Sequence, residues 1–338
     1  MSTTITLKDI AQKLNISVST VSRALKDHPR IGPHTKRRVI AYAKEVGYFE
    51  KKFGHVLDQE TNAIGVIVPK IRYHLYANAI SGIEEIAEAH GMHIIICQSN
   101  ESYEREKSLV KQFMDLGVAG LLVSIAGETK KFAHFEMLKS YGIPLVFFNR
   151  LCDEVHTDKV VIDNFRAAHN ATTHLISVGC KRIAYLGGPE GVQISNTRMQ
   201  GYKNALERMG LPFDESLVAH CSFDRESRMT QARKLLYAPN YPDGILAFSD
   251  QIAISLMIAA KERGLRIPED ISIVGFNNEP VDELLQPSLT SIEQPGYQMG
   301  REAAKLVLRR RKDPHKVIDR KVLSSHLIIR ESTNKNKR

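Results

Sequence analysis

Near the amino terminus, several small hydroxyl side chains and one arginine lie close together. They are Ser17, Ser19, Thr20, Ser22 and Arg23. Serine and threonine hydroxyls commonly contact phosphate oxygens, and an arginine guanidinium can form two hydrogen bonds with a guanine edge. Val18, within the same stretch, can offer apolar contact to a thymine methyl group. These residue types point to nucleic-acid recognition if one helical face presents them together.

The surrounding pattern predicts three short helices that would position these side chains. They are expected over Leu7–Leu14, over Val18–Leu25 and from Gly32-Pro33 to Val46. Thr6 can cap the first helix and Ser17 the second, although Ser17 can equally contact a phosphate. Two short helices joined by a tight turn predict a helix-turn-helix, whose second helix enters the major groove. A generic cap of a helical bundle is the alternative interpretation.

The net charge of +9 is distributed unevenly along the 338 residues. Residues 1–61 carry 11 Lys/Arg and 6 Asp/Glu, residues 62–300 carry 23 and 28, and residues 301–338 carry 13 and 4. A basic amino-terminal segment on an acidic body suggests a polyanionic partner for that segment. We interpret the basic run Arg309–Lys312 as a helix carboxyl terminus stabilised by cations and followed by a solvated tail.

Composition favours a globular protein of the cytoplasm. The four cysteines lie far apart without metal-ligand spacing, so we expect free thiols, no metal and no cofactor. No apolar run approaches the ~20 residues that span a bilayer. The first residues lack a basic segment followed by an apolar core, so we expect no secretion signal and no membrane partner.

Beyond residue 62 the sequence alternates between short apolar runs and amphipathic segments. The expected strands are Ala63–Val68, His93–Cys97, Gly120–Val123 and Leu145–Phe148, then Arg182–Leu186, Gly244–Ala247 and Ile271–Gly275. Strands that alternate with helices indicate βαβ units on parallel sheets. The two series predict two similar lobes.

The stretch TLKDIAQKLNISVSTVSRAL, with the later Thr35 and Gly47-Tyr48, resembles the head of the LacI family of bacterial transcriptional regulators. The resemblance implies that Val18, Ser19 and Arg23 read bases. It implies that Ser17, Thr20, Ser22 and Thr35 contact phosphates, and we add Thr6 to the predicted DNA contacts.

The segment after Tyr48 departs most from the family pattern. There the family has a small hinge helix with a leucine that wedges into the minor groove, and Leu57 keeps that position. Glu50 and Lys51 replace the usual proline and asparagine. Gly54 replaces an alanine, which costs a helix about 1 kcal/mol. An inert linker role for Leu57 stays open.

The body also resembles this family, whose core looks like the periplasmic sugar-binding proteins. Matching stretches include Ala63–Pro69, His174–Gly179, Arg198–Tyr202 and Pro268–Phe276. The resemblance implies an α/β fold: a two-lobed, periplasmic-binding-protein-like core with doubly wound parallel sheets, preceded by the all-α helix-turn-helix head. Three crossings, expected near residues 162, 290 and 323, divide the chain into 1–60 (head and hinge), 61–162 plus 291–322, and 163–290 plus 323–338.

Carried over residue by residue, the family places a small effector between the lobes, at the carboxyl ends of the strands. Arg198 would bind it by its planar guanidinium and Phe223 would pack on it. The further candidates are Tyr76, Ser124, Asn149, Arg150, Ser249, Asn277 and Gln294. Each of these could instead be a strand-end cap or an interlobe contact. Tyr73-His74 replaces a usual Asn-Pro, and Asn277 replaces a common acidic residue.

The resulting hypothesis is a transcriptional regulator, acting as a repressor, that binds a pseudo-palindromic operator in double-stranded DNA as a homodimer. A sugar or sugar derivative would control it. Two alternative classes share this core: an enzyme on the same sheet, and a secreted sugar receptor. The sequence has no GxGxxG after a strand, no GxxxxGK, GxSxG or HExxH motif, and Gly187–Gly191 is read as a turn near the cleft.

Overall fold

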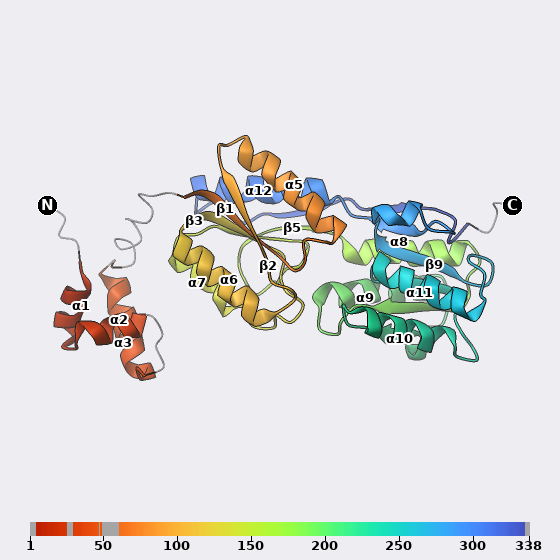
Figure 1. Cartoon of the computed structure of the whole chain (residues 1–338), viewed down its shortest axis with the longest axis horizontal. Helices are drawn as coiled ribbons and strands as arrows, with labels where there is room; N and C mark the ends of the chain where they lie inside the picture. The colour runs from red at the N-terminus through yellow and green to blue at the C-terminus, as the bar shows by residue number, and fades with distance from the viewer. Residues whose placement is uncertain (1–4, 26–29, 47, 49–60, 335–338) are drawn as a thin grey trace.

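The computed structural model describes residues 5–25, 30–46, 48 and 61–334 (Figure 1). Leu57 and the rest of the predicted hinge lie outside these residues. The helices are α1 (Leu7–Leu14), α2 (Val18–Leu25), α3 (Pro33–Glu45), α5 (His74–Glu88), α6 (Tyr103–Leu116), α7 (Ala133–Ser140), α8 (Asn164–Ser177), α9 (Gln193–Arg208), α10 (Arg225–Leu236), α11 (Asp250–Arg263) and α12 (Gly296–Lys312), with short 3-10 turns η1 (Glu215–Leu217) and η2 (Pro280–Glu283). The strands are β1 (Thr61–Val68), β2 (His93–Gln98), β3 (Val118–Val123), β4 (Leu145–Phe148), β5 (Asp158–Ile162), β6 (Ile183–Gly187), β7 (Val218–His220), β8 (Gly244–Ala247), β9 (Ser272–Asn277), β10 (Thr290–Glu293), β11 (Arg320–Leu323) and β12 (His326–Ile328).

The head consists of the three predicted helices around a small apolar core. Thr6 caps α1 with a capping box, because its hydroxyl accepts from the Asp9 amide and the Asp9 carboxylate accepts from the Thr6 amide at 2.6 Å. Ile10, Val21 and Val39 are fully buried, one from each helix. The helical periodicity therefore predicted the three helices of the head.

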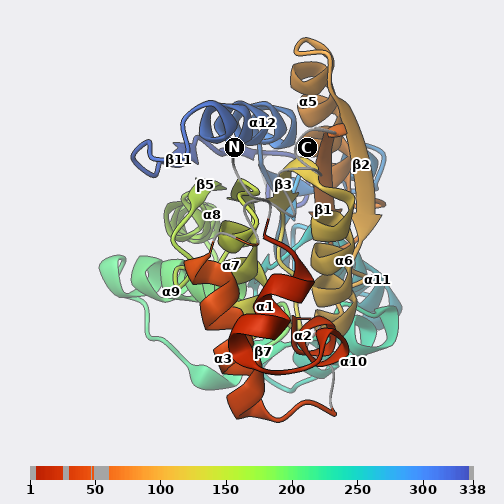
Figure 2. The ribbon, with the colours of Figure 1, turned by 90° about the vertical axis from the view of Figure 1, so that its left-hand side faces the viewer.

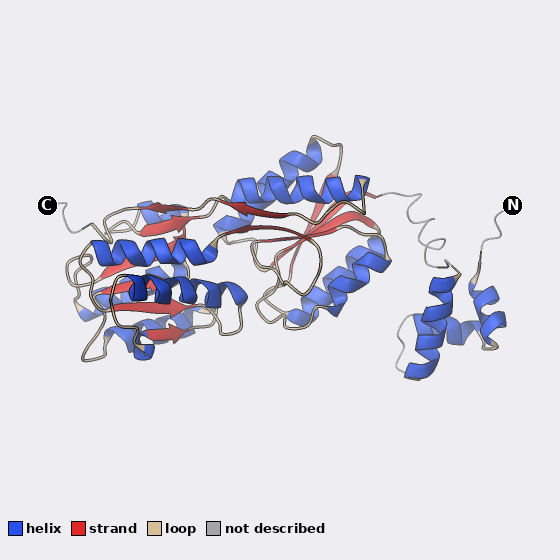
Figure 3. Cartoon of the chain, turned by 180° about the vertical axis from the view of Figure 1, so that it is seen from behind, coloured by secondary structure: helices blue, strands red, loops and turns tan. Residues whose placement is uncertain are grey.

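The first lobe is built on a sheet of the order β11-β5-β4-β3-β1-β2, in which every neighbouring pair is parallel. On β1, Ile64, Val66 and Val68 belong to the apolar core that includes α5 and α12. Ile67, pointing the other way, packs with α6 and α7. Helices thus cover both faces (Figure 3), which explains why β1 is a continuous apolar run.

The second lobe repeats this plan with the order β12-β10-β9-β8-β6-β7. Its strands are parallel except for β12, which pairs antiparallel with β10. The reason is topological: β10 leads out toward the first lobe and β12 returns from it, so neighbouring strands at this edge run in opposite directions. The expected doubly wound fold is confirmed, with this one antiparallel strand as a departure.

The chain crosses between the lobes three times (Figure 2 views the molecule along its long axis). The crossings follow β5 at Ile162, follow β10 at Glu293, and lie between β11 and β12. The expected second boundary at 290 was placed too early, because residues 291–293 pair with β9 in the second sheet. Leu323 likewise belongs to the first sheet, through its pairing with Ile162.

Two glycines allow α5 and α12 to approach closely in the first lobe. A Cβ at Gly82 would lie 2.1 Å from the Tyr297 carbonyl oxygen, and one at Gly300 would lie 1.9 Å from that of Ala79. No side chain fits at these distances, so both positions require glycine for contact rather than for backbone conformation. This close contact between α5 and α12 fixes α12 over the sheet. Because α12 lies between the second and third connections of the lobes, it also positions those two connections.

We therefore predict that Gly300→Ala lowers the free energy of unfolding by about 2 kcal/mol or more, because the helices must separate to admit the methyl group. Chemical denaturation followed by circular dichroism measures this change. Ser81→Ala, at an exposed position of α5, is the control and should be nearly neutral. Equal stability of the two variants would contradict the prediction.

Candidate functional site

The first candidate site is the outward surface of α2. Val18 is 43% exposed, Ser19 and Arg23 are exposed, and Thr20 and Ser22 are half-buried. Val21 and Ala24 point into the head core, so packing of these two residues fixes which face is presented. Arg23 makes no hydrogen bond or ion pair with any described residue, so its guanidinium is available for a base edge.

Ser17 and Thr6 both act as helix caps. The Ser17 hydroxyl accepts from the Thr20 amide at 3.1 Å and lies 2.8 Å from the hydroxyls of Ser19 and Thr20. The hydroxyl of Thr6 donates to Asp9 at 2.7 Å. Thr35 lies half-buried in the first turn of α3. Capping leaves room for phosphate contact by Ser17, since that side chain remains exposed.

The second candidate site is a cavity between the lobes. Eight of the nine predicted effector residues line it, and they come from both lobes: Tyr76, Asn149, Arg150, Arg198, Phe223, Ser249, Asn277 and Gln294. Ser124 is the exception. It is fully buried behind Tyr76, with 3.0 Å between the two hydroxyl oxygens. Its position is therefore that of a support for Tyr76.

On the side of the first lobe, a polar network holds Tyr76 and Arg150 in place. Asn149 donates to the Tyr76 hydroxyl at 3.0 Å, and Arg150 donates to Glu101 at 2.7 Å. Burial raises the pKa of Tyr76, which keeps it a neutral donor. Burial opposes the charge of Arg150, but its surroundings, including the Glu101 carboxylate to which it donates, outweigh burial and raise the pKa of Arg150. This guanidinium is thus a fixed, charge-balanced group.

Arg198, on the side of the second lobe, is buried without a carboxylate partner among the described residues. It donates to the Asn164 side chain at 2.9 Å and to the Phe248 carbonyl at 2.6 Å. The guanidinium carbon lies 3.4 Å from the ring centre of Phe276 and 4.7 Å from that of Phe248. Burial lowers the pKa of Arg198. A ligand that supplies acceptor oxygens would satisfy this charge better than the protein does alone.

Two asparagines at the cavity have left-handed backbone conformations, with φ of 59° at Asn149 and 117° at Asn277. Such conformations are sparse for residues other than glycine and concentrate at binding sites. Gln294 holds Asn277 by donating to its side-chain oxygen at 2.6 Å. The positive φ at position 277 is thus a further reason for an asparagine there, beside the hydrogen-bond donors that the amide adds.

The lobes are close together in this structure. Arg150 of the first lobe lies 4.8 Å from the ring centre of Phe223 of the second, and Gln193 donates across the gap to Asp153 at 3.0 Å. The cavity is about 60 Å³. That is room for a few water molecules and is well below the roughly 300–1,000 Å³ of typical small-molecule sites. Entry of a sugar therefore requires the lobes or these side chains to move.

The structure adds cavity residues that the sequence analysis missed. They are Tyr73, Leu75, Ile194, Ser222, Arg228, Phe248, Gln251, Ile252 and Glu279. Ser222, Phe248 and Gln251 lie within two positions of predicted residues, so proximity to strand ends could have found them. Arg228, on α10, carries no such signal. Its guanidinium donates to the Phe223 carbonyl at 2.7 Å and so fixes that aromatic residue.

Behind the cavity wall lies a buried acidic pair, Asp250 and Asp282. Asp250 accepts from Ser291 at 2.5 Å and from the Glu279 amide at 3.0 Å. Burial, followed by the charge of Asp250, raises the pKa of Asp282 to about 8. The pair therefore holds a proton at neutral pH. No group of side chains suited to a metal ion occurs in the described ranges.

Comparison with known proteins agrees with this geometry. A family profile described as bacterial regulatory proteins of the lacI family matches residues 6–50, and one described as a periplasmic binding protein-like domain matches 172–333. The chain is 35% identical to the HTH-type transcriptional repressor CytR of Escherichia coli K12 over 98% of this chain and 97% of that protein.

Solved structures show the same likeness. The cellobiose complex of the transcriptional regulator CelR superposes with a TM-score of 0.75 at 29% identity, covering 97% of this chain and 99% of that one. A LacI family regulator from Enterococcus faecium with bound ribose gives 0.72 at 30% identity, covering 81% and 100%. The chain belongs to the LacI family and is a DNA-binding transcriptional regulator.

We predict that Arg23→Ala weakens binding to the preferred DNA site by about 1–3 kcal/mol and relaxes base preference at one position per half-site. Fluorescence anisotropy on specific and random duplexes measures both effects. Lys13→Ala, on α1, is the control and should leave the ratio of specific to random affinity unchanged. An unaltered ratio for Arg23→Ala would refute a base contact.

We also predict that stability falls as pH rises, through Asp282. The folded state keeps this proton up to about pH 8, whereas an unfolded aspartate releases it near pH ~4. Stability from the protonated group is therefore full below about pH 4 and is lost as pH rises toward 8. Thermal unfolding midpoints between these limits should fall less steeply in Asp282→Asn than in the wild type. Glu207→Gln, an exposed control on α9, should keep the wild-type slope.

Proposed function

We propose that this regulator is a repressor that binds a pseudo-palindromic operator as a homodimer and responds to a sugar or sugar derivative held between its lobes. The observation that carries the proposal is the combination, in one chain, of an exposed recognition surface on α2 and an interlobe cavity with two buried arginines. Two-fold symmetric half-sites call for a two-fold symmetric protein.

The site residues are assigned as follows. In the head, Val18, Ser19 and Arg23 read bases, Ser17, Thr20, Ser22, Thr35 and Thr6 contact the backbone, and Leu57 enters the minor groove. In the core, Arg198 and Arg150 supply donors from opposite sides, and Phe223 offers an apolar face. The amides of Asn149, Asn277 and Gln294, with Ser249 and Tyr76, complete the polar lining.

This mixture of donors and aromatic faces suits a ligand with many hydroxyl groups. Sugars are bound by planar arginine and amide side chains together with stacking on aromatic rings. The relatives crystallised with cellobiose and ribose support the same class for this chain. Binding alone explains the geometry, so we propose no catalysis, no cofactor and no metal.

The finer organisation is also proposed. The head and hinge comprise residues 1–60, and the two sheets define lobes that exchange segments after Ile162, after Glu293 and between Leu323 and His326. Among the described helices none has the length and apolar character to span a bilayer. We place the protein in the cytoplasm, where its DNA is.

The test is operator titration with and without effector. A thermal-shift screen starting with ribose and cellobiose identifies the effector, since a ligand raises the melting temperature by mass action. We expect Arg198→Lys to raise the effector dissociation constant at least about tenfold and to leave operator affinity without effector near wild type, because a lysine cannot reproduce the planar fork.

Arg166→Lys, an exposed substitution on α8, is the matched control and should respond normally. Because Arg198 is buried among aromatic rings, the melting temperature of each variant is measured first. A folded Arg198→Lys variant with wild-type response would place the effector elsewhere.

A further inference from the structure

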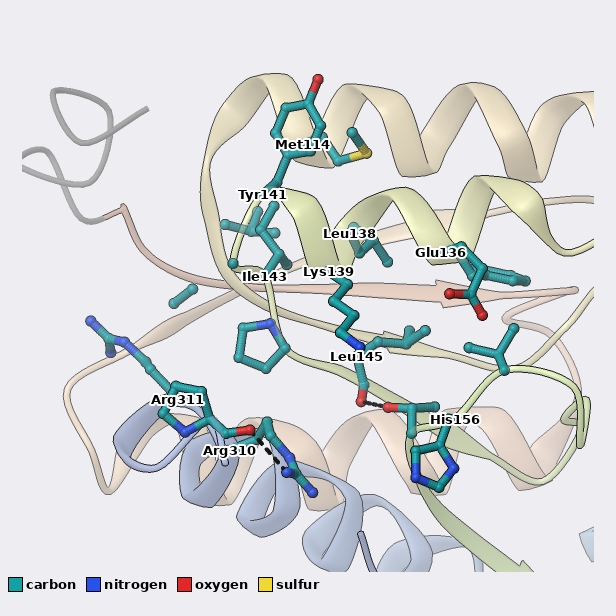
Figure 4. Close-up of a pocket in the computed structure, with 18 of the residues that line it drawn as sticks. Met114, Glu136, Leu138, Lys139, Tyr141, Ile143, Leu145, His156, Arg310 and Arg311 are labelled. Carbon is teal, nitrogen blue, oxygen red and sulfur yellow. Dashed lines mark hydrogen bonds between the residues drawn. The ribbon is translucent and has the colours of Figure 1, made fainter. Parts of the chain in front are cut away.

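A larger cavity lies at the other end of the first lobe, away from the interlobe cleft (Figure 4). Its volume is about 680 Å³, within the roughly 300–1,000 Å³ typical of small-molecule sites. It opens among the loops before β3, β4 and β5, the end of α7 and the end of α12. Thr61, the first described residue after the connection from the head, also lines it.

The floor of this cavity is apolar. Phe135, Leu138 and Leu145 line it, belong to the core beneath α7 and are almost completely buried. Pro144 and Ile143 continue the same wall. A ligand that reaches the floor would therefore bury apolar atoms, which is favourable in proportion to the area removed from water.

Cationic side chains surround the opening. Lys139, Arg310, Arg311 and Lys316 are among the residues that line it, and Glu136 is the one lining residue with a carboxylate. Figure 4 shows Lys139 extending from α7 into the space opposite α12. Neither Lys139 nor Lys316 forms an ion pair with any described residue. Both charges are thus available to a ligand.

The arrangement of this rim is held by a buried ion cluster. Asp158 is fully buried and pairs with Arg309 at 3.1 Å and with Arg310 at 2.9 Å. Arg310 also donates to the carbonyl oxygens of Pro314 at 3.2 Å and of Lys316. The loop that carries Lys316 is therefore fixed against α12. The basic run does end α12, as expected, and in addition its first two arginines pair with a buried carboxylate that the sequence did not indicate.

We propose that this cavity is a second ligand site, distinct from the cleft, for a small organic anion with an apolar body, such as an aromatic carboxylate, sulfonate or phosphate. The anionic group would lie between Lys139 and Lys316, and the apolar part would reach toward Leu138 and Leu145. DNA can touch the rim, but a rigid duplex cannot enter a cavity of this size. A bound molecule would contact β1 where the connection from the head enters the lobe.

The test uses 8-anilinonaphthalene-1-sulfonate as the probe, in the full chain. The sequence contains no tryptophan, so Tyr141→Trp places a single fluorescence donor in the cavity wall. Tyr237→Trp, in the second lobe, is the matched donor control. We expect saturable energy transfer to the probe with Tyr141→Trp and much weaker transfer with Tyr237→Trp.

Charge reversal then tests the rim. Lys139→Glu combined with Lys316→Glu should raise the dissociation constant of the probe about tenfold, through loss of two charge-assisted contacts. Lys261→Glu, an exposed substitution on α11, should have no effect. Because all three lysines are exposed, each variant should retain the wild-type melting temperature, which is checked beforehand.

An unchanged probe affinity in the doubly reversed variant would overturn the proposal. Stronger transfer from Tyr237→Trp than from Tyr141→Trp would overturn it too, since the probe would then sit in the second lobe. A third outcome, weaker operator binding with unchanged probe binding, would make the rim a DNA contact and also reject the ligand site. None of these readings depends on whether the cleft binds a sugar.

Discussion

The three crossings between the lobes all leave from the carboxyl ends of strands, and the rest of the core follows from this. β5, β10 and β11 each run toward the opposite lobe before the chain crosses. The carboxyl edges of the two sheets must therefore face one another. Side chains that end different strands, such as Asn149 and Asn277, are brought to one cavity although they are far apart in sequence. Three covalent connections restrict the lobes to bending about this edge.

The two arginines in the cavity show how unequal charge compensation prepares a site for a ligand. Arg150 is neutralised by Glu101, whereas Arg198 has only an amide, a carbonyl and two aromatic faces. Neutral acceptors stabilise a buried cation less well than a carboxylate does. Arg150 therefore organises its own lobe, whereas Arg198 can still bind acceptor oxygens of a ligand. This asymmetry would be lost if both were paired.

The parts of the fold that the sequence predicted are those where one pattern dominates. The caps at Thr6 and Ser17 and the apolar periodicity set the head helices, and long apolar runs revealed strands such as β1. The strands it missed include β7, β11 and β12, which are short and only partly buried, so they lack an apolar run. β10 is mostly buried, but its sequence TSIE contains one apolar residue, Ile292, so it forms no apolar run, and this displaced the second boundary.

The cleft residues were predicted from the family resemblance, which also gave Tyr76 and Arg198 on helices, whereas the sequence pattern alone points only to residues at strand ends. Ser249 and Asn277 follow or end apolar strands, whereas Arg228 lies in the first turn of α10 and reaches the cleft through tertiary packing. The ion cluster around Asp158 was equally hidden, because its partners Arg309 and Arg310 are 151 and 152 positions away. A run of charged residues in a sequence does not indicate whether any of them pairs with a buried residue of opposite charge.

The closeness of the lobes also bears on how an effector would act. A ligand shifts an equilibrium only by its different affinity for the two arrangements. With a cavity of about 60 Å³, the arrangement described here has little affinity for a sugar, so binding must favour a more open or rearranged cleft. Movement of the second lobe is carried to the first through the crossing beside α12, which the glycine contacts fix to α5 and the sheet. β1 lies in that same sheet and directly follows the connection from the head. A change of the angle between the lobes therefore displaces the start of β1, to which the head is connected.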